Sequence, residues 1–190
     1  GKDRESALAE VLSEEAKSFE RIIFNGDGYS EEWHKEAEEE RGLLNLRNSV
    51  DALNTLMSQK NADLFDKYEV LSPDELNSRY EILIEQYFIA INIEGETTAD
   101  IAKTMLLPAA VRYLNDLLAV ADRSKTLGVS GAGVGKILDE VTGLVDEFTD
   151  AIATLVARNA EEANGDAAAE AKHVRDSVVP AMTRVREVAD

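Results

Sequence analysis

His34 and Glu38 are four residues apart, and their side chains are of types that can bind a metal ion. On a helix, side chains at this spacing lie on one face, and imidazole and carboxylate are both zinc ligands. A metal site needs more than two such ligands, and the only other histidine is His173, far away in the sequence. Because glutamates crowd the segment around His34, we interpret it as a solvated, charged helix face.

Glu81 and Glu85 form a second pair at the same spacing. Paired carboxylates in a helical bundle can hold a di-metal centre, but such centres use repeated Glu-x-x-His motifs. Here the residues three positions after the two glutamates are Ile84 and Phe88. The sequence therefore predicts no di-metal centre.

The stretch GAGVGK (131–136) is similar to a phosphate-binding loop. The motif G-x-x-x-x-G-K-[ST] would need glycine at Ser130, a hydroxyl residue at Ile137 and a preceding strand, and the sequence has none of these. We predict an interhelical loop over Thr126–Lys136 instead. Since no Ser-His-Asp arrangement or basic-aromatic patch occurs either, the residues indicate no catalytic, cofactor-binding or metal-binding site.

Composition narrows the class of protein. The chain has 190 residues, 44% of them hydrophobic, which is enough for a folded core. Its net charge of −18 repels nucleic acid and anionic lipid, so we expect neither nucleic acid nor membrane as a partner. The absence of cysteine, of a signal-peptide pattern and of an apolar run long enough to span a membrane leads us to expect a cytoplasmic protein.

Residues 1–71 are expected to form an irregular helical part. An apolar stripe at helical spacing predicts a first helix, ended by the turn residues of Asn25–Gly28. Ser30 is expected to cap a short acidic helix that Gly42 terminates, with Tyr29 and Trp33 packed in the corner. Short helices are expected around 50–57 and 62–68. The first stripe consists of Leu8, Val11, Leu12, Phe19, Ile22 and Ile23.

Residues 72–190 are predicted to form a bundle of long helices. Ser72-Pro73-Asp74-Glu75 is a capping box with proline at the first helical position, the clearest helix start in the chain. The apolar stripe that follows is Leu76, Tyr80, Leu83, Ile84, Tyr87, Phe88 and Ile91.

Within this bundle the sequence also contains helix-breaking signals. Thr97 with Asp100 is similar to a second capping start, and Pro108 predicts a kink or a break. A long amphipathic helix follows over 137–156, then a turn at 164–166 and a last helix containing Pro180. No strand pattern is present. We therefore predict an all-α fold, an antiparallel bundle of three to four long helices preceded by short helices.

Three long stretches, taken in order, resemble the C-terminal region of type III glutamine synthetases. They are IFNGDGYSEEWHKEAEEERGLLNLR, YEVLSPDELNSRYEILIEQY…INIE…DIAKTMLLPAAVRY, and AEAKHVRDSVVPAMTRVREVAD. The resemblance is strongest over about 20–115 and 166–190 and is only a helical pattern over about 123–165. Two departures are the polar stretch at Glu94–Asp100 and a chain that stops short of the family's usual end.

The resemblance implies a parent enzyme that makes glutamine from glutamate, ammonia and ATP with two divalent metal ions. In that family the β-scaffold that carries the metal ligands and phosphate-binding arginines lies N-terminal to the present segment, so no catalytic residue carries over. It implies a non-catalytic chain whose partners are the catalytic region and neighbouring subunits of the parent. ATP and metal are implied only for the parent.

Leu43, Leu44 and Leu46 are the candidate interaction residues. They form an apolar step directly after an acidic helix and do not fit its amphipathic register. If the chain is one domain of a larger enzyme, they are a candidate docking surface. The alternative is that they pack under the helix that begins at Ser72.

We carry three hypotheses forward. The first is a non-catalytic domain of a type III glutamine synthetase that serves subunit architecture or assembly. The second is a freestanding helical module that binds a protein partner and has no enzyme activity. The third, an enzyme in its own right, has the least support, because no residue pattern indicates a catalytic site.

Overall fold

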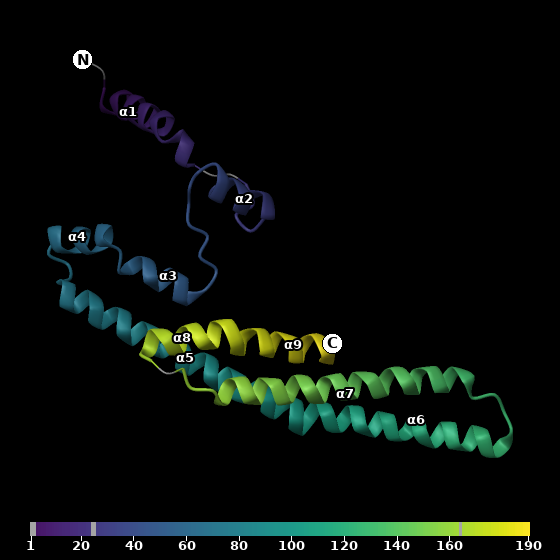
Figure 1. Ribbon diagram of the computed structural model, residues 1–190. Coiled ribbons are helices and arrows are strands. Elements are labelled where there is room, and N and C mark those ends of the chain that lie inside the picture. Colours follow the sequence, from purple (N-terminus) through teal and green to yellow (C-terminus); the bar gives the residue numbers. More distant parts are fainter. Residues whose placement is uncertain (1–2, 24–25, 164) are drawn as a thin grey trace. The chain divides into compact units, whose positions relative to one another are not determined.

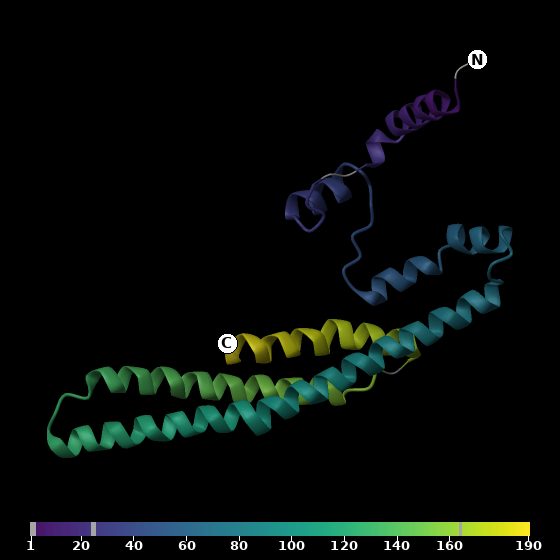
Figure 2. The ribbon, with the colours of Figure 1, turned by 180° about the vertical axis from the view of Figure 1, so that it is seen from behind.

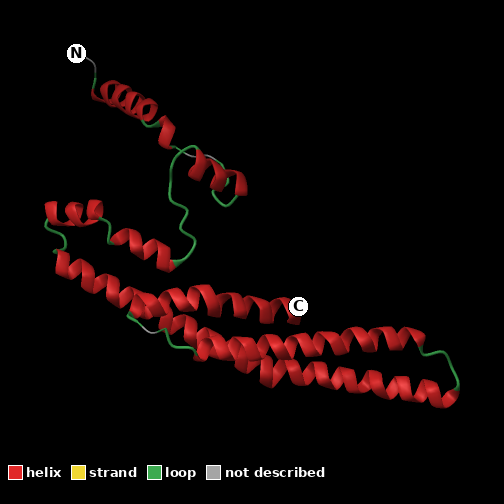
Figure 3. Ribbon diagram, in the orientation of Figure 1, coloured by secondary structure: helices red, strands yellow, loops and turns green. Residues whose placement is uncertain are grey.

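The computed structural model describes residues 3–23, 26–163 and 165–190. Figure 3 shows helices and loops, and the described residues contain no strand, which confirms the predicted all-α fold. The chain divides into two compact units, Gly1–Leu46 and Arg47–Asp190. The proposed division at residue 71 into an irregular part and a bundle stays a prediction.

The first unit consists of α1 (Arg4–Ser18), a short 3-10 turn η1 (Glu20–Ile22) and α2 (Glu31–Glu39). Asp3 caps α1 by accepting a hydrogen bond from the amide of Glu5 (2.6 Å). Ser30 caps α2 through the amide of Trp33 (3.2 Å), as predicted. Gly42, with φ of +63°, ends the corner after α2, where the Leu43 amide donates to the carbonyl of Ala37 (2.8 Å).

The apolar stripe of the first helix is solvent-exposed. Leu8, Val11 and Leu12 are each more than half exposed, and α1 has no buried residue. The α-helix ends at Ser18, earlier than the predicted turn, of which Asn25 lies outside the described residues. Tyr29 is 93% exposed, so the expectation that it packs in the corner is wrong.

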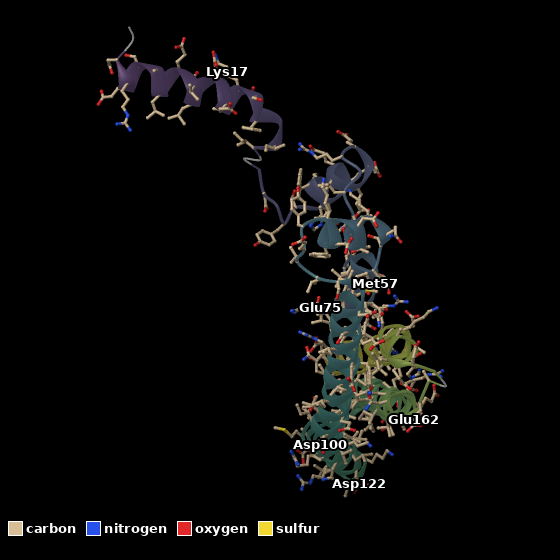
Figure 4. The ribbon with its side chains drawn as sticks, turned by 90° about the vertical axis from the view of Figure 1, so that its left-hand side faces the viewer. Lys17, Met57, Glu75, Asp100, Asp122 and Glu162 are labelled. Carbon is tan, nitrogen blue, oxygen red and sulfur yellow. The ribbon has the colours of Figure 1, made fainter. Side chains whose placement is uncertain are left out.

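The second unit begins with α3 (Ser49–Leu56) and α4 (Gln59–Lys67), close to the two predicted short helices. The next helix, α5 (Pro73–Ile101), begins at the predicted capping box. The Ser72 hydroxyl accepts from the Glu75 amide (3.3 Å), and the Glu75 carboxylate accepts from the Ser72 amide (2.8 Å). Figure 4 labels Glu75 at this end of the helix.

Pro108 does not break the long helix. A single π turn, η2 (Ala102–Leu106), joins α5 to α6 (Leu107–Leu127), and the rod runs on without interruption. Proline lacks an amide proton, and its ring clashes with the carbonyl four residues earlier. The wider turn, in which the Leu107 amide bonds to the Ala102 carbonyl five residues back, relieves this clash.

A second rod, α7 (Ala132–Ala160), returns antiparallel along α6. The connecting loop is shorter than the predicted Thr126–Lys136, because α6 ends at Gly128 (φ +68°) and α7 starts at Ala132. The third rod consists of α8 (Ala167–His173), the π turn η3 (Val174–Val178) and α9 (Val179–Ala189). Figure 1 shows this yellow rod lying along α5 and α7, in agreement with the contacts between these elements. The second unit is thus an antiparallel arrangement of three rods.

The core lies where the three rods meet. Among its members are the fully buried Leu155, Val174 and Val178. On α5, Leu76 and Ile84 are also fully buried, outside this cluster. Ile84 packs with Val50 of α3 and Ala171 of α8. Leu83 is 42% exposed, so the expectation that it belongs to the buried stripe of α5 is wrong. The neighbouring Ile84 occupies the buried position because α3 and α8 both cover that side of α5.

At Gly95 the rods approach each other closely. A Cβ added there would overlap the Asn159 side chain of α7 and lie 3.1 Å from Val178 of η3. The Asn159 amide reaches across to donate to the Asn92 carbonyl (3.2 Å). The predicted second helix start at Thr97 and Asp100 is wrong, because α5 continues through it and the Thr97 hydroxyl donates to the Ile93 carbonyl (2.8 Å).

Candidate functional site

The structure gives His34 and Glu38 different partners. Nδ1 of His34 lies 3.8 Å from the Glu31 carboxylate and has no hydrogen-bond partner. The Glu38 carboxylate accepts from the Asn45 side chain (2.6 Å), across the corner that Gly42 makes. In the described ranges, no three His, Cys, Asp or Glu side chains come together as metal ligands do.

The second acidic pair lies on the exposed side of α5. The Glu81 carboxylate accepts from the Asn77 side chain (2.9 Å), one turn earlier on the same helix, and Glu85 is exposed. The glycines of GAGVGK begin α7, with no side-chain cap. Neither feature forms a site with other parts of the described chain.

Leu43, Leu44 and Leu46 lie in the extended segment after α2. They are 53%, 74% and 37% exposed. The hydrogen bond from the Leu43 amide to the Ala37 carbonyl fixes the start of this segment. The rest of the segment has no regular secondary structure. The segment therefore places three exposed leucines within four residues.

Sequence reasoning missed a charged cluster between α3 and η3. Arg175 donates to Asp51 (2.6 Å) and also to Asp176 (2.7 and 3.0 Å). Asn48, the N-cap of α3, holds Asp51 by donating from its side chain (2.7 Å). Arg175 and Asp51 are 124 positions apart, so no local pattern relates them. The cluster neutralises a half-buried guanidinium and ties α3 to the third rod.

The ionisable groups of this cluster are perturbed in the directions that its contacts dictate. The hydrogen bond with Asp176 raises the pKa of Arg175, and the same bond lowers the pKa of the Asp176 carboxyl. Burial raises the pKa of the nearby Tyr87 phenol. The shifts of Arg175 and Asp176 stabilise the charges that these groups already carry at neutral pH, and the shift of Tyr87 keeps its phenol neutral. These directions are expected of a structural ion pair rather than of a general acid or base.

The surface of the second unit has further exposed apolar residues. On α6 these include Val111, Tyr113, Leu118, Val120 and Leu127. Even so, no helix in the described ranges is long and apolar enough to cross a bilayer.

Comparison with protein families gives a match to one described as "Glutamine synthetase C-terminal domain", over residues 7–125. Among individual relatives, the type-3 glutamine synthetase of Dictyostelium discoideum is 30% identical over 98% of this chain, which corresponds to 26% of that protein. A glutamine synthetase of Butyrivibrio fibrisolvens is 32% identical over 100% of this chain and 27% of its own length.

A glutamine synthetase of Bacteroides fragilis is 33% identical over 67% of this chain. The chain therefore spans about a quarter of the length of the first two relatives. The family that the three sequence stretches resembled is confirmed.

Proposed function

Because the chain belongs to the glutamine synthetase C-terminal domain family, we propose that it is the non-catalytic helical domain of a type III glutamine synthetase. Its proposed role is in subunit architecture or assembly. The observation that carries the proposal is that a type-3 glutamine synthetase and a second glutamine synthetase align with 98–100% of the chain but with only 26–27% of their own length. The remaining three quarters of such a parent would carry the chemistry.

In the proposed parent, ATP and divalent metal ions bind outside this chain, and ammonia is ligated to glutamate in the cytoplasm. The contacts of the acidic residues support this division. The carboxylates of Glu38 and Glu81 accept hydrogen bonds from neighbouring asparagines, and Asp51 and Asp176 are paired with Arg175. These contacts are structural, and they hold the helices and their corner in place.

We assign Leu43, Leu44 and Leu46 to a docking surface for the catalytic region or a neighbouring subunit of the parent. Their exposure supports this assignment, since contiguous exposed leucines on a folded domain usually mark an interaction site. Leu44 is the most exposed of the three, at 74%, and contributes most to the proposed surface.

The test uses the whole protein encoded by the gene that contains this chain. Leu43, Leu44 and Leu46 are replaced together by serine, and the control is Leu64→Ser, a 49% exposed leucine on α4. The triple variant should shift the enzyme from its full assembly to smaller species on size-exclusion chromatography with light scattering. The control should keep the full assembly, and helicity by circular dichroism should be the same in both.

Two results would overturn the proposal. A gene that encodes no catalytic region beside this chain would favour the freestanding binding module. Glutamine formation by the 190-residue chain alone, lost on mutation of one of its residues, would make this chain itself the enzyme.

A further inference from the structure

The α6–α7 hairpin extends beyond the end of α9. Figures 1 and 2 both show the C-terminus beside the hairpin, with only α6 and α7 continuing from there. Val188 and Ala189, at the end of α9, line a hollow together with Tyr113 of α6 and Leu144 of α7. Outward from this hollow, no third helix of the second unit, as far as the structure describes it, covers that face of the hairpin.

Apolar side chains line this uncovered face at intervals of seven residues. On α6 they are Tyr113, Val120 and Leu127, which are 52%, 45% and 76% exposed. On α7 they are Leu144 and Ile137, which are 46% and 42% exposed. Seven residues are close to two helical turns, so each set lies along one side of its helix. We call these five residues the tip strip.

The tip strip is separate from the seam that joins the two helices. Leu117, between Tyr113 and Val120, is buried against α7. Each helix of the hairpin therefore presents a second apolar side. Because Tyr113 and Leu144 border the same hollow, Val120 lies two turns further out at the level of Ile137 and Leu138.

Charge favours a second copy of this chain as the occupant of the strip. Residues 107–160 carry five basic and seven acidic side chains, a net charge of −2 out of −18 for the whole chain. The hairpin therefore carries little of the negative charge that makes two copies of so acidic a chain repel each other.

The charges beside the strip are self-complementary. Asp116 and Arg123 are exposed and each lies three residues after a strip residue, so both flank the strip on α6. When a second α6 lies antiparallel and is centred on Val120, its Leu127 faces Tyr113 and its Arg123 faces Asp116. The two-fold axis makes each of these contacts twice. A parallel arrangement would place like charges opposite each other instead.

Residues of α7 repeat this arrangement. Lys136 and Glu140 are exposed and lie on either side of residue 138, at the level of Val120. The same two-fold axis therefore brings Lys136 of each copy to Glu140 of the other. Within the part of the chain that the structure describes, Asp116, Arg123, Lys136 and Glu140 form no ion pair.

We propose that two copies of this chain pair through their tip strips, antiparallel and with their hairpin tips pointing in opposite directions. The inference rests on the proposed role in assembly and names the partner. Four helices then enclose the strip, which is how amphipathic hairpins commonly bury an apolar side that two helices leave open.

The test is sedimentation equilibrium of the 190-residue chain at several concentrations. The unmodified chain should sediment as a mixture of monomer and dimer in equilibrium, with the dimer fraction rising with concentration. Asp116→Arg and Arg123→Asp should each raise the dissociation constant by about tenfold or more, because both symmetric contacts turn repulsive. The matched control is Asp122→Arg, which reverses a charge on the opposite side of α6, and it should leave the dissociation constant within about twofold.

Mixing the two variants gives the decisive result. Asp116→Arg in one copy faces Arg123→Asp in the other, so a mixture of the two should form a heterodimer although each alone is weakened. Circular dichroism checks that each variant is folded. A chain that stays monomeric, or a dimer indifferent to both reversals and to mixing, would overturn this pairing. The proposed function would stand, because it is measured on the whole enzyme.

Discussion

Two isoleucines on α5 have opposite environments although they are only two residues apart. Ile84 is fully buried against α3 and α8, whereas Ile82 is half exposed. A buried isoleucine replaced by alanine loses transfer free energy and leaves a cavity.

Ile84→Ala should therefore lower the free energy of unfolding by about 2–5 kcal/mol. Ile82→Ala, the matched control, should change it by no more than about 0.5 kcal/mol. Urea unfolding followed by circular dichroism measures both. Equal effects of the two substitutions would mean that the assigned face of α5 is wrong.

Gly95 makes a second prediction about a single residue. Alanine has a helix propensity about 1 kcal/mol more favourable than that of glycine, so Gly→Ala inside a helix normally raises the stability of the protein. At Gly95 the added methyl would collide with Asn159 and separate α5 from α7. Gly95→Ala should destabilise the chain, and Gly143→Ala, where nothing lies within 4 Å, should stabilise it. Thermal unfolding distinguishes the signs, and a stabilised Gly95→Ala would contradict the close approach.

Asp176 gives a prediction for pH. Its bond with Arg175 lowers the pKa of the carboxyl below the ordinary 3.8, so the folded state holds this proton less tightly than the unfolded state. The stability that the pair contributes is full above the ordinary value and is lost as pH falls through the folded pKa. The difference in unfolding free energy between the native chain and Asp176→Asn should be constant above about pH 5 and should shrink as the pH falls below the ordinary value of 3.8. A difference that stays constant would show that the pair contributes nothing.

At the scale of elements, the helix ends are set by local chemistry. Ser72 caps α5 through the Glu75 amide and receives the reciprocal bond from the Glu75 carboxylate. Ser72→Ala should cost about 1 kcal/mol of unfolding free energy, because one amide at the start of the helix loses its acceptor. Ser78→Ala, on the exposed surface of the same helix, is the control and should be neutral or slightly stabilising. Denaturant titration tests the pair, and equal costs would contradict the cap.

Signals that act within a few residues could be read from the sequence. The caps at Ser30 and Ser72 and the corner at Gly42 depend only on their immediate neighbours. The choice between Leu83 and Ile84 does not, because both fit a helical stripe and only the partners from α3 and α8 decide which one is buried. The glycines of GAGVGK favour a loop by propensity, yet α7 begins among them, since packing along α6 outweighs propensity.

Of the candidate surfaces, some can be recognised in the sequence and others only in the structure. The leucine step at 43–46 is visible in the sequence because it follows an acidic helix directly. The Arg175 cluster cannot be recognised in the sequence, because its partner Asp51 lies 124 positions away along the chain. The tip strip has a seven-residue spacing that the sequence contains, but only the end of α9 shows which side of the hairpin remains uncovered.

At the scale of the whole molecule, the dominant quantity is the net charge of −18. Self-repulsion of this size opposes compact states, and salt screens it over distances of about 10 Å at 0.1 M. The melting temperature should therefore rise with sodium chloride at neutral pH. Near the isoelectric point of about 4.5, the same salt series should have little effect, which serves as the control. A melting temperature that falls with salt at neutral pH would mean that attractive ion pairs outweigh the repulsion.

The two π turns also determine where the chain tolerates a change in length. A turn closed by a bond to the fifth residue back holds one residue more than an α turn, so each π turn is equivalent to an α-helix with a single insertion. Deleting one residue from Ala102–Leu106 together with Pro108→Ala would restore an ordinary helix and leave both flanking faces in register. The same deletion inside α6 would turn every later side chain by about 100° and move the seam away from α7. Among related chains, single-residue insertions and deletions within the rods should therefore fall at these two turns, each two residues before its proline.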